Sequence, residues 1–431
     1  MDDYAIKLLD VDIVAREFEE HRRLEQQIAD KTRHASYVQA PRNTHFREDV
    51  PAADPSPDVE SRRSSLPSWQ EKSAKRRPRR KRVGILLLIL ALAGIAGIAG
   101  GSGGYYTKFQ KYQQSISLLQ SSRLSALNFT DASGHENHLV YYQANGLDIF
   151  QAMWNSTTLG WQTSRVTGAD CDVKNNTPIA ANVYWNSNDE MGFHVYYLDS
   201  QNVIQRRWSS LKDGVWYGAQ NGTVVAAASS DLASQGSTCY KCLQDDMIIF
   251  QDDAGNLQMS SVVNGTWKMP ERSIVASNVS QGTGFAAVPQ FSINPATFAV
   301  FYHDSKKQTL EGTLWNGTTW NPWLFGSNLW PPVSMAAFAF GWDKTQKRAS
   351  KLQILATNSE GLLAFTNWNN TSGWTVPTIN EKFLEYTMVA TNEAGRFYGI
   401  TRPDQEHEVV HLTQWAYDDD GNYEWIGNMD I

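Results

Sequence analysis

Paired tryptophans are the residues of this sequence whose type and spacing best suit a binding site. An indole offers a flat apolar face and one N–H donor, so it either fills a core or meets a ligand. Five times a first tryptophan is followed by a second one five to ten residues later, and a sixth unit keeps only the second. The first positions are Trp154, Trp208, Val262, Trp315, Trp368 and Trp415, and the second are Trp161, Trp216, Trp267, Trp320, Trp374 and Trp425.

Both sets of positions repeat with the same period. The first set steps by 54, 54, 53, 53 and 47 residues, and the second by 55, 51, 53, 54 and 51. A fixed period of about 40 to 50 residues is typical of a propeller or a solenoid. Helical periodicity and leucine-rich spacing are missing after residue 124, which disfavours the solenoid.

Each unit contains four short runs that read as strands. In the second unit these are PIAANVYW, GFHVYYLD, NVIQRRW and GVWYG, bounded by Gly, Asn, Asp and Ser. Alternating hydrophobic residues between such turn formers indicate half-buried strands, and four strands per roughly 50 residues form a propeller blade. The sequence therefore predicts an all-β, six-bladed β-propeller over residues 125–431.

This succession of strands resembles the fungal fucose-specific lectin family, which forms six-bladed propellers that bind fucose between blades. The resemblance is carried by HLVYYQ with QAMWNS, by FHVYYLD with NVIQRRW, and by FAVFYHD with TLEGTLWNG. In that family a pocket takes an Arg from the second strand, in an Arg-Val-Tyr-Tyr-like run, a Glu from the third strand, and stacking aromatic residues. The charged pair bonds adjacent hydroxyls, and the aromatic face covers the apolar patch of the sugar ring.

On this alignment no unit keeps the charged pair. The Arg position holds Leu139, His194, Met247, Ala299, Gln353 and Phe397, and the Glu position holds Gln151, Gln205, Met259, Gly312, Phe365 and Leu412. The resemblance thus implies a carbohydrate-binding protein with remodelled or degenerate pockets. Its candidate binding residues are the six second tryptophans together with His194, Gln205 and Gln151.

Two sets of these residues would form a sugar site if they converged on one cavity, namely Gln205 and His194 with Trp216, or Gln151 with Trp161. Neutral hydrogen bonds and stacking hold a sugar more weakly than a charged pair does. We therefore expect little monovalent fucose binding. Recognition would appear only on multivalent glycan surfaces and would weaken when Trp216 or Trp161 is replaced by Ala.

The alternative interpretation is that the tryptophans only pack the blades, and that the propeller binds protein or acts as a spacer. An enzyme is not expected. The run SSLKDGVW comes near the S-x-D-x-G-x-T-W turn of sialidases but misses its spacing, and it does not repeat. Nucleophile elbows, HExxH motifs and phosphate loops are missing as well, so we assign no catalytic residue and no cofactor.

An apolar run ahead of the repeats predicts a membrane anchor. Residues 83–100 carry no charge, and the basic block KRRPRRKR precedes them. Such a block stays in the cytoplasm, so residues 83–104 are predicted to be a type II signal anchor rather than a buried core helix. Residues 1–82 form a mostly disordered cytoplasmic tail, and residues 105–124 form a stalk. A nuclear signal is the alternative reading of the basic block.

Glycosylation sequons and charge support the same topology. All sequons follow the apolar run, which predicts an extracellular or lumenal glycoprotein: Asn128, Asn155, Asn175, Asn221, Asn264, Asn278, Asn316, Asn369 and Asn370. Residues 1–82 have a net charge of +3, and the remainder has −10. So acidic an ectodomain is not expected to bind nucleic acid.

The expected partners are therefore glycans and the membrane, with a second copy of the chain as a further candidate. Small residues recur every four positions in the span, at Ala93, Gly97 and Gly101, a spacing that lets two helices approach closely and dimerise. The three cysteines, Cys171, Cys239 and Cys242, allow one disulfide, either local or linked to Cys171. No metal site is expected, because the single CxxC motif has no second half.

Overall fold

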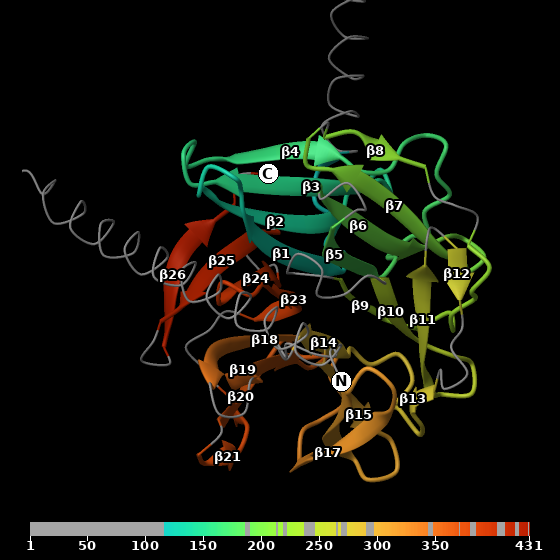
Figure 1. Cartoon of the computed structure of the whole chain (residues 1–431), viewed down its shortest axis with the longest axis vertical. Coiled ribbons are helices and arrows are strands. Elements are labelled where there is room, and N and C mark those ends of the chain that lie inside the picture. Colours follow the sequence, from blue (N-terminus) through green and yellow to red (C-terminus); the bar gives the residue numbers. More distant parts are fainter. Residues whose placement is uncertain are drawn as a thin grey trace, which may run out of the picture. The chain divides into compact units, whose positions relative to one another are not determined.

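The computed structural model describes part of the chain, and the fold is reported for that part. It covers residues 116–431 except 186–189, 213, 219–221, 237–245, 264–265, 269–273, 290–296, 344–347, 370, 380–384, 403–409, 419–421 and 430. Six antiparallel sheets lie around a common centre, and each uses strands that are consecutive in sequence (Figure 1). The predicted all-β six-bladed propeller is confirmed. The predicted tail and anchor lie outside the described residues.

The six sheets are the blades, numbered in chain order. Blade 1 contains β1 (Leu124–Thr130), β2 (Glu136–Gln143), β3 (Ile149–Asn155) and β4 (Trp161–Arg165). Blade 2 contains β5 (Ile179–Trp185), β6 (Met191–Leu198), β7 (Ile204–Ser210) and β8 (Trp216–Tyr217). Blade 3 contains β9 (Leu232–Gln235), β10 (Asp246–Gln251), β11 (Leu257–Val263) and β12 (Thr266–Lys268), and a short β13 (Ile274–Ala276) also pairs with β11.

The other three blades repeat this order. Blade 4 contains β14 (Ala286–Pro289), β15 (Phe298–Asp304), β16 (Thr309–Trp315) and β17 (Trp320–Ser327). Blade 5 contains β18 (Ser334–Asp343), β19 (Arg348–Thr357), β20 (Leu363–Asn369) and β21 (Gly373–Trp374), with β22 (Thr378–Ile379) added on β20. Blade 6 contains β23 (Tyr386–Thr391), β24 (Arg396–Thr401), β25 (Leu412–Tyr417) and β26 (Tyr423–Asn428).

Acidic and amide side chains shape the tight turns between strands. The same turn occurs five times: a side-chain Oδ1 accepts hydrogen bonds from the backbone N–H groups two and four residues further on, at 2.8–3.2 Å. Asp and Asn favour turns because their short side chains bond the nearby backbone. The residues concerned are Asp131, Asp199, Asp252, Asn358 and Asn392.

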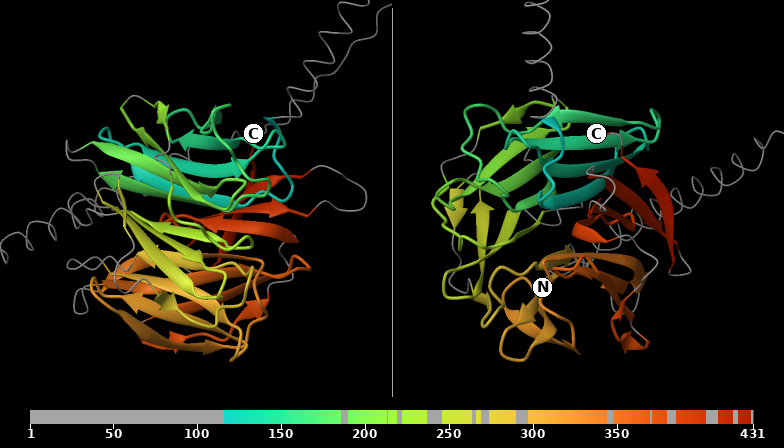
Figure 2. Two further views of the ribbon diagram at one scale, coloured as in Figure 1. Left: turned by 90° about the vertical axis from the view of Figure 1, so that its right-hand side faces the viewer. Right: turned by 180° about the vertical axis from the view of Figure 1, so that it is seen from behind.

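The first strand of every blade lies innermost, as the labels β1, β5, β9, β14, β18 and β23 show in Figure 1. Figure 2 shows the same sheets from the side and from behind. These strands surround a central cavity of about 150 Å³ and carry small residues such as Ala126, Ala180, Ala233 and Ala286. Arg123, just before β1, crosses to other blades: its Nη1 donates to the Val333 carbonyl at 2.6 Å and lies 3.9 Å from Asp231 Oδ2. This one side chain therefore ties blade 1 to the segments that lead into blades 3 and 5.

Hydrophobic side chains fill the interfaces between neighbouring blades, which we call seams and name by the two blades that meet. Six buried clusters occupy the six seams. The cluster of the 6–1 seam includes Val140, Tyr142, Tyr398, Ile400 and Leu412. Because blades 1 and 6 share no strand, this packing is what closes the ring. Leu118, in the segment predicted as a stalk, packs on the same cluster.

Among the described residues no helix combines the length and apolar character that a bilayer crossing needs. The predicted span, residues 83–104, falls outside them.

Candidate functional site

The second tryptophans lie on the fourth strands, and four of them pack against the preceding blade. Their rings meet second-strand aromatic rings edge to face, with centroid distances of 6.0 Å for Trp161 and Tyr398, 6.1 Å for Trp216 and Tyr141, and 6.0 Å for Trp267 and Tyr196. Trp374 meets Phe301 of blade 4 in the same way at 5.5 Å. Each of these indoles is half-buried. Blade packing, the alternative reading of the repeat, is thus a real role of these tryptophans.

The remaining two second tryptophans follow the pattern less closely. Trp320 packs on the cluster of the 3–4 seam. Trp425 is 42% exposed and lies 4.9 Å from Trp415 in its own blade. A site in a seam is therefore built from the second and third strands of one blade and the fourth-strand tryptophan of the next.

The structure brings neither set of residues onto one face of its sheet. Residues directly paired across a sheet share a face, and successive residues alternate faces. His194 pairs with Trp208, whereas Gln205 pairs with Tyr197 and Trp216 pairs with Ser209, so His194 lies on the opposite face from Gln205 and Trp216. Gln205 instead donates from Nε2 to Asp199 Oδ2 in the adjacent turn, at 2.7 Å.

Gln151 and Trp161 are separated in the same way. Gln151 pairs with Tyr141, which faces blade 2, and Trp161 pairs with Trp154 on the face toward blade 6. The tryptophan that meets the face of Gln151 is Trp216, from the next blade. The two sets do not converge, because the tryptophan that meets each pair of second and third strands comes from the following repeat.

Strand pairing also corrects the Glu position in blade 2. In blade 1 this position is Gln151, which pairs with Tyr141 on the second strand. Tyr141 in turn contacts Trp216, the fourth-strand tryptophan of blade 2. The same pairing in blade 2 selects Arg206, opposite Tyr196, and not Gln205. His194 and Arg206 face blade 3, where Asp246 Oδ2 lies 2.6 Å from His194 Nδ1 and 4.0 Å from Arg206 Nη1. All three side chains are almost wholly buried, so this cluster joins two blades.

Blade 6 departs most from the sequence-based assignment, which placed Phe397 and Leu412 at the Arg and Glu positions. The tyrosine that meets the next tryptophan is Tyr398, so the Arg position two residues earlier is Arg396. The residue paired with Tyr398 is Gln414, which takes the Glu position. One repeat therefore does keep the arginine. The signal was present in the run Arg396-Phe397-Tyr398, which has the order of the family's Arg-Val-Tyr run.

The Arg396 guanidinium lies over an aromatic face across the 6–1 seam. Its Cζ is 5.3 Å from the centre of the Trp154 ring, a cation–π contact. It forms no hydrogen bond or ion pair with any residue in the described ranges, so its donors remain available. Gly395 sets the turn before it with φ +73°, a left-handed conformation that favours glycine. The Gln414 amide is 4% exposed, and its Nε2 has no hydrogen-bond partner among the described residues.

The 6–1 seam also contains a carboxylate from blade 1, that of Glu136. Glu136 Oε1 is 2.9 Å from His138 Nε2, and Asn392 of blade 6 contacts His138 Nδ1 from Nδ2 at 3.0 Å. Burial opposes ionisation of Glu136, but the His138 contact and the charges of His138 and Arg396 lower its pKa below the usual value. Burial lowers the pKa of His138, against the influence of Glu136.

The other seams lack such a set of groups. Met247 and Met259 stand at the two positions in blade 3, and Ala299 and Gly312 in blade 4, so neither offers polar side chains. Leu139 removes the cation from blade 1. The 6–1 seam thus holds the one set in the described structure that combines an unpaired guanidinium, a nearby carboxylate and two indoles.

Sequons and cysteines fall at distinct places in the fold. Asn155, Asn316 and Asn369 occupy equivalent turns between third and fourth strands, where each Oδ1 accepts from the backbone N–H two residues on. Asn128 lines the central cavity and accepts from Ala394 N at 3.1 Å. Asn175 and Asn278 are exposed in connections between blades, whereas Asn221 and Asn264 lie outside the described residues.

Cys171 is a free thiol, and Cys239 and Cys242 are not among the described residues, so the disulfide stays a prediction. Within the part of the chain that is described, no group of three or more His, Cys, Asp or Glu side chains could hold a metal ion.

Comparisons with known proteins confirm the family resemblance and the fold. Residues 106–233 match the family model described as fungal fucose-specific lectin. The AofleA structure from Arthrobotrys oligospora aligns with a TM-score of 0.58 at 17% identity, covering 74% of this chain and 88% of AofleA. The Aleuria aurantia lectin, described as a six-bladed β-propeller with a novel fucose recognition mode, aligns with a TM-score of 0.58 at 16% identity, covering 73% and 97%.

A bacterial structure is similar too. The BP39L lectin from Burkholderia pseudomallei aligns with a TM-score of 0.50 at 18% identity, covering 71% of this chain and 84% of BP39L. No curated protein matches the sequence. At these identities the structural likeness establishes the propeller fold.

Proposed function

We propose that this protein is a membrane-anchored, carbohydrate-binding propeller, and that its working sugar site is the 6–1 seam. The observation that carries the proposal is the Arg396 guanidinium, which lies over Trp154 and has no ion-pair partner among the described residues; Trp154 pairs with Trp161 on the neighbouring strand. A guanidinium donates charge-assisted hydrogen bonds to hydroxyl oxygens, and an indole covers the C–H face of a sugar ring. The family match and the lectin structures with the same fold support this function. A neutral, fucose-like sugar is the first candidate ligand.

Replacement of Arg396 tests the proposal. Full-length protein in detergent micelles would be measured by biolayer interferometry on a surface of polymer-bound α-L-fucose. We expect Arg396→Ala to weaken binding by roughly 10- to 100-fold, because a hydrogen bond to a charged group contributes about 1.5–3 kcal/mol. Arg165→Ala is the matched control, since that arginine is 48% exposed and forms an ion pair with Asp148. Unchanged binding by Arg396→Ala would exclude the 6–1 seam.

The other five seams are proposed to be degenerate as sugar sites. Apolar residues, neutral amides or internally paired charges stand at their two polar positions, as in the buried cluster of His194, Arg206 and Asp246. A monovalent protein of this kind gains avidity only when several copies lie on one membrane. A propeller that binds protein instead would show no sugar-dependent signal in the same assay.

Membrane anchoring through residues 83–104 is part of the proposal and rests on the basic block and the one-sided sequons. The propeller would then lie outside the cell or in a lumen, with the amino terminus in the cytoplasm. Glycosidase treatment of the membrane-inserted protein should lower its mass. Glycosylation at a sequon engineered into the first 80 residues would reverse this topology.

Self-association through the span is proposed on the small residues at Ala93, Gly97 and Gly101. Replacing Gly97 and Gly101 by Ile should abolish crosslinked dimers in membranes. Crosslinking that persists would remove the proposal.

A further inference from the structure

We propose that Glu136 supplies the carboxylate acceptor of the 6–1 sugar site, across the seam from Arg396. The inference rests on the proposed function and adds a residue that determines which sugar binds. Its starting point is the loss of a carboxylate from the third strand, where Gln414 stands. An amide oxygen accepts a hydroxyl hydrogen bond more weakly than a carboxylate does, so a second acceptor has to come from elsewhere.

Glu136 lies on the face of blade 1 that meets blade 6. It is two residues before His138, which pairs with Trp154, so Glu136, His138 and Trp154 share this face. Its side chain is 44% exposed, which leaves it open to a ligand. Arg396 and Glu136 form no ion pair with each other, yet the charge of Arg396 lowers the pKa of Glu136. Their charges are thus close but not mutually bonded.

A short chain of contacts fixes the orientation of the carboxylate. Asn392 Oδ1 accepts from the Arg396 backbone N–H at 3.2 Å, which leaves Nδ2 as the donor to His138 Nδ1. A histidine that accepts at Nδ1 carries its proton on Nε2, and Glu136 Oε1 lies 2.9 Å from that nitrogen. The second oxygen, Oε2, is then the free acceptor. His138 is a positioning residue, because it is fully buried and reaches no ligand.

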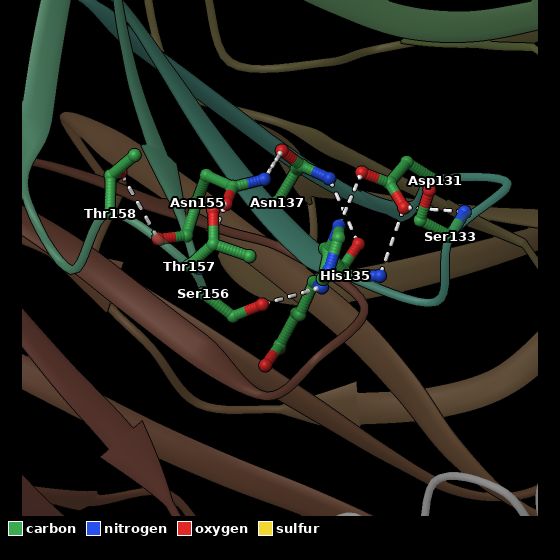
Figure 3. Close-up of polar contacts among 9 residues, drawn as sticks. Asp131, Ser133, His135, Asn137, Asn155, Ser156, Thr157 and Thr158 are labelled. Carbon is green, nitrogen blue, oxygen red and sulfur yellow. Dashed lines mark hydrogen bonds and ion pairs between the residues drawn. The ribbon is translucent and has the colours of Figure 1, made fainter.

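The backbone around Glu136 is also held in place, as Figure 3 shows for its neighbours. Glu136 N donates to Ser156 Oγ at 3.2 Å, and Ser156 N donates to the Glu136 carbonyl at 2.9 Å. On the opposite face, Asn155 Nδ2 donates to Asn137 Oδ1 at 2.8 Å (Figure 3). The carboxylate therefore stands on a rigid strand end and needs little ordering when a ligand binds.

This pair of groups selects a class of sugar. Arg396 donates to hydroxyl oxygens and Glu136 accepts hydroxyl protons, so together they suit two neighbouring hydroxyls of a neutral sugar. A sugar that carries its own carboxylate would be repelled by Glu136. The site is thus expected to discriminate against uronic and sialic acids.

The test uses Glu136→Gln in the full-length protein, with Glu360→Gln as control because Glu360 is exposed in a turn of blade 5. On the α-L-fucose surface at pH 7, Glu136→Gln should bind roughly 10- to 100-fold more weakly, and the control should match the parent. Binding by the parent should fall only when the pH drops well below 4.5, the ordinary pKa of a glutamate, because the pKa of Glu136 is lowered, whereas Glu136→Gln should show no such fall. Relative binding to a sialic acid surface should rise in Glu136→Gln.

Further variants separate the roles of the residues. Glu136→Asp keeps the charge at a shorter reach and should also weaken binding, which guards against a fold effect in Glu136→Gln. Unchanged binding in both Glu136 variants, with binding lost in Arg396→Ala, would overturn this inference and leave the proposed function standing. No sugar binding by the parent protein would overturn both.

Discussion

Removal of the Arg123 side chain tests how the propeller ring is held together. Arg123 Nη1 donates to the Val333 carbonyl at 2.6 Å and lies 3.9 Å from Asp231 Oδ2, with only 16% and 12% of the two side chains exposed. Replacing Arg123 by Met keeps the apolar stem but leaves the Asp231 carboxylate buried without its cation. Breaking a buried pair from one side costs about 3–5 kcal/mol, and the long separation here favours the lower end.

The expected size of the effect is measurable by thermal unfolding. The entropy of unfolding is about 2.1 cal/mol/K per residue near 60 °C, so about 3 kcal/mol over roughly 310 residues corresponds to a melting temperature about 5 °C lower. Tryptophan fluorescence of the full-length protein in micelles would follow the transition. Arg165→Met is the control, because its exposed ion pair with Asp148 is expected to contribute under about 1 kcal/mol.

A pH dependence distinguishes the lost charge from lost packing. Burial raises the pKa of Asp231, and the charge of Arg123 partly opposes this. Without Arg123 the folded-state pKa rises further, so the folded protein prefers the protonated acid. The deficit of Arg123→Met should therefore be largest at pH 7 and should shrink toward pH 4. A deficit that is equal at both pH values, or a shift of under about 1 °C at pH 7, would refute the role given to the pair.

Further predictions concern tryptophans, titration, glycans and the turn before Arg396. Trp161→Ala should weaken binding to the fucose surface, whereas Trp216→Ala should lower the melting temperature but leave binding unchanged; the reverse outcome would place the site in the 1–2 seam. Burial raises the pKa of Glu393 to about 7, so the folded state binds more protons than the unfolded state between pH 4.5 and 7, and stability falls as the pH rises through that window. Glu393→Gln should remove this loss, raising stability at pH 8 but not at pH 4, as measured by urea unfolding. Peptide mass spectrometry should find glycans at Asn316 and Asn369 but none at Asn128, whose carboxamide is bonded to Ala394 inside the ring. Gly395→Ala should destabilise the protein by about 1 kcal/mol through its φ of +73° and should weaken sugar binding, in contrast to Gly255→Ala, which has a φ of +78° in the equivalent turn of blade 3, away from the 6–1 seam.

The local architecture followed directly from the sequence. Strand alternation and turn residues are short-range signals, and for that reason the four runs chosen in the second unit correspond closely to β5, β6, β7 and β8. Two sets of tryptophans with one period were enough to count six blades. The resemblance to the fucose-lectin family rested on the same local patterns.

The composition of the site depended on tertiary structure. A strand pair has two faces, and sequence spacing does not say which neighbouring blade each face meets. For that reason His194 and Trp216 were grouped from the sequence, although they lie on opposite faces of their sheet. The one-residue error at Phe397 hid Arg396, because alternation alone gives no absolute register in a strand whose two faces are both buried in seams.

The sequence by itself determined that the chain forms a ring of six four-stranded blades, since each blade is coded by contacts within about 50 residues. Only the folded ring decided which side chains meet. Closure brings blade 6 against blade 1, so Arg396 and Trp154, more than 240 positions apart, form one contact across a seam. Because a seam is made by the rotation of one blade against the next, its chemistry is a property of pairs of repeats and cannot be read from a single repeat.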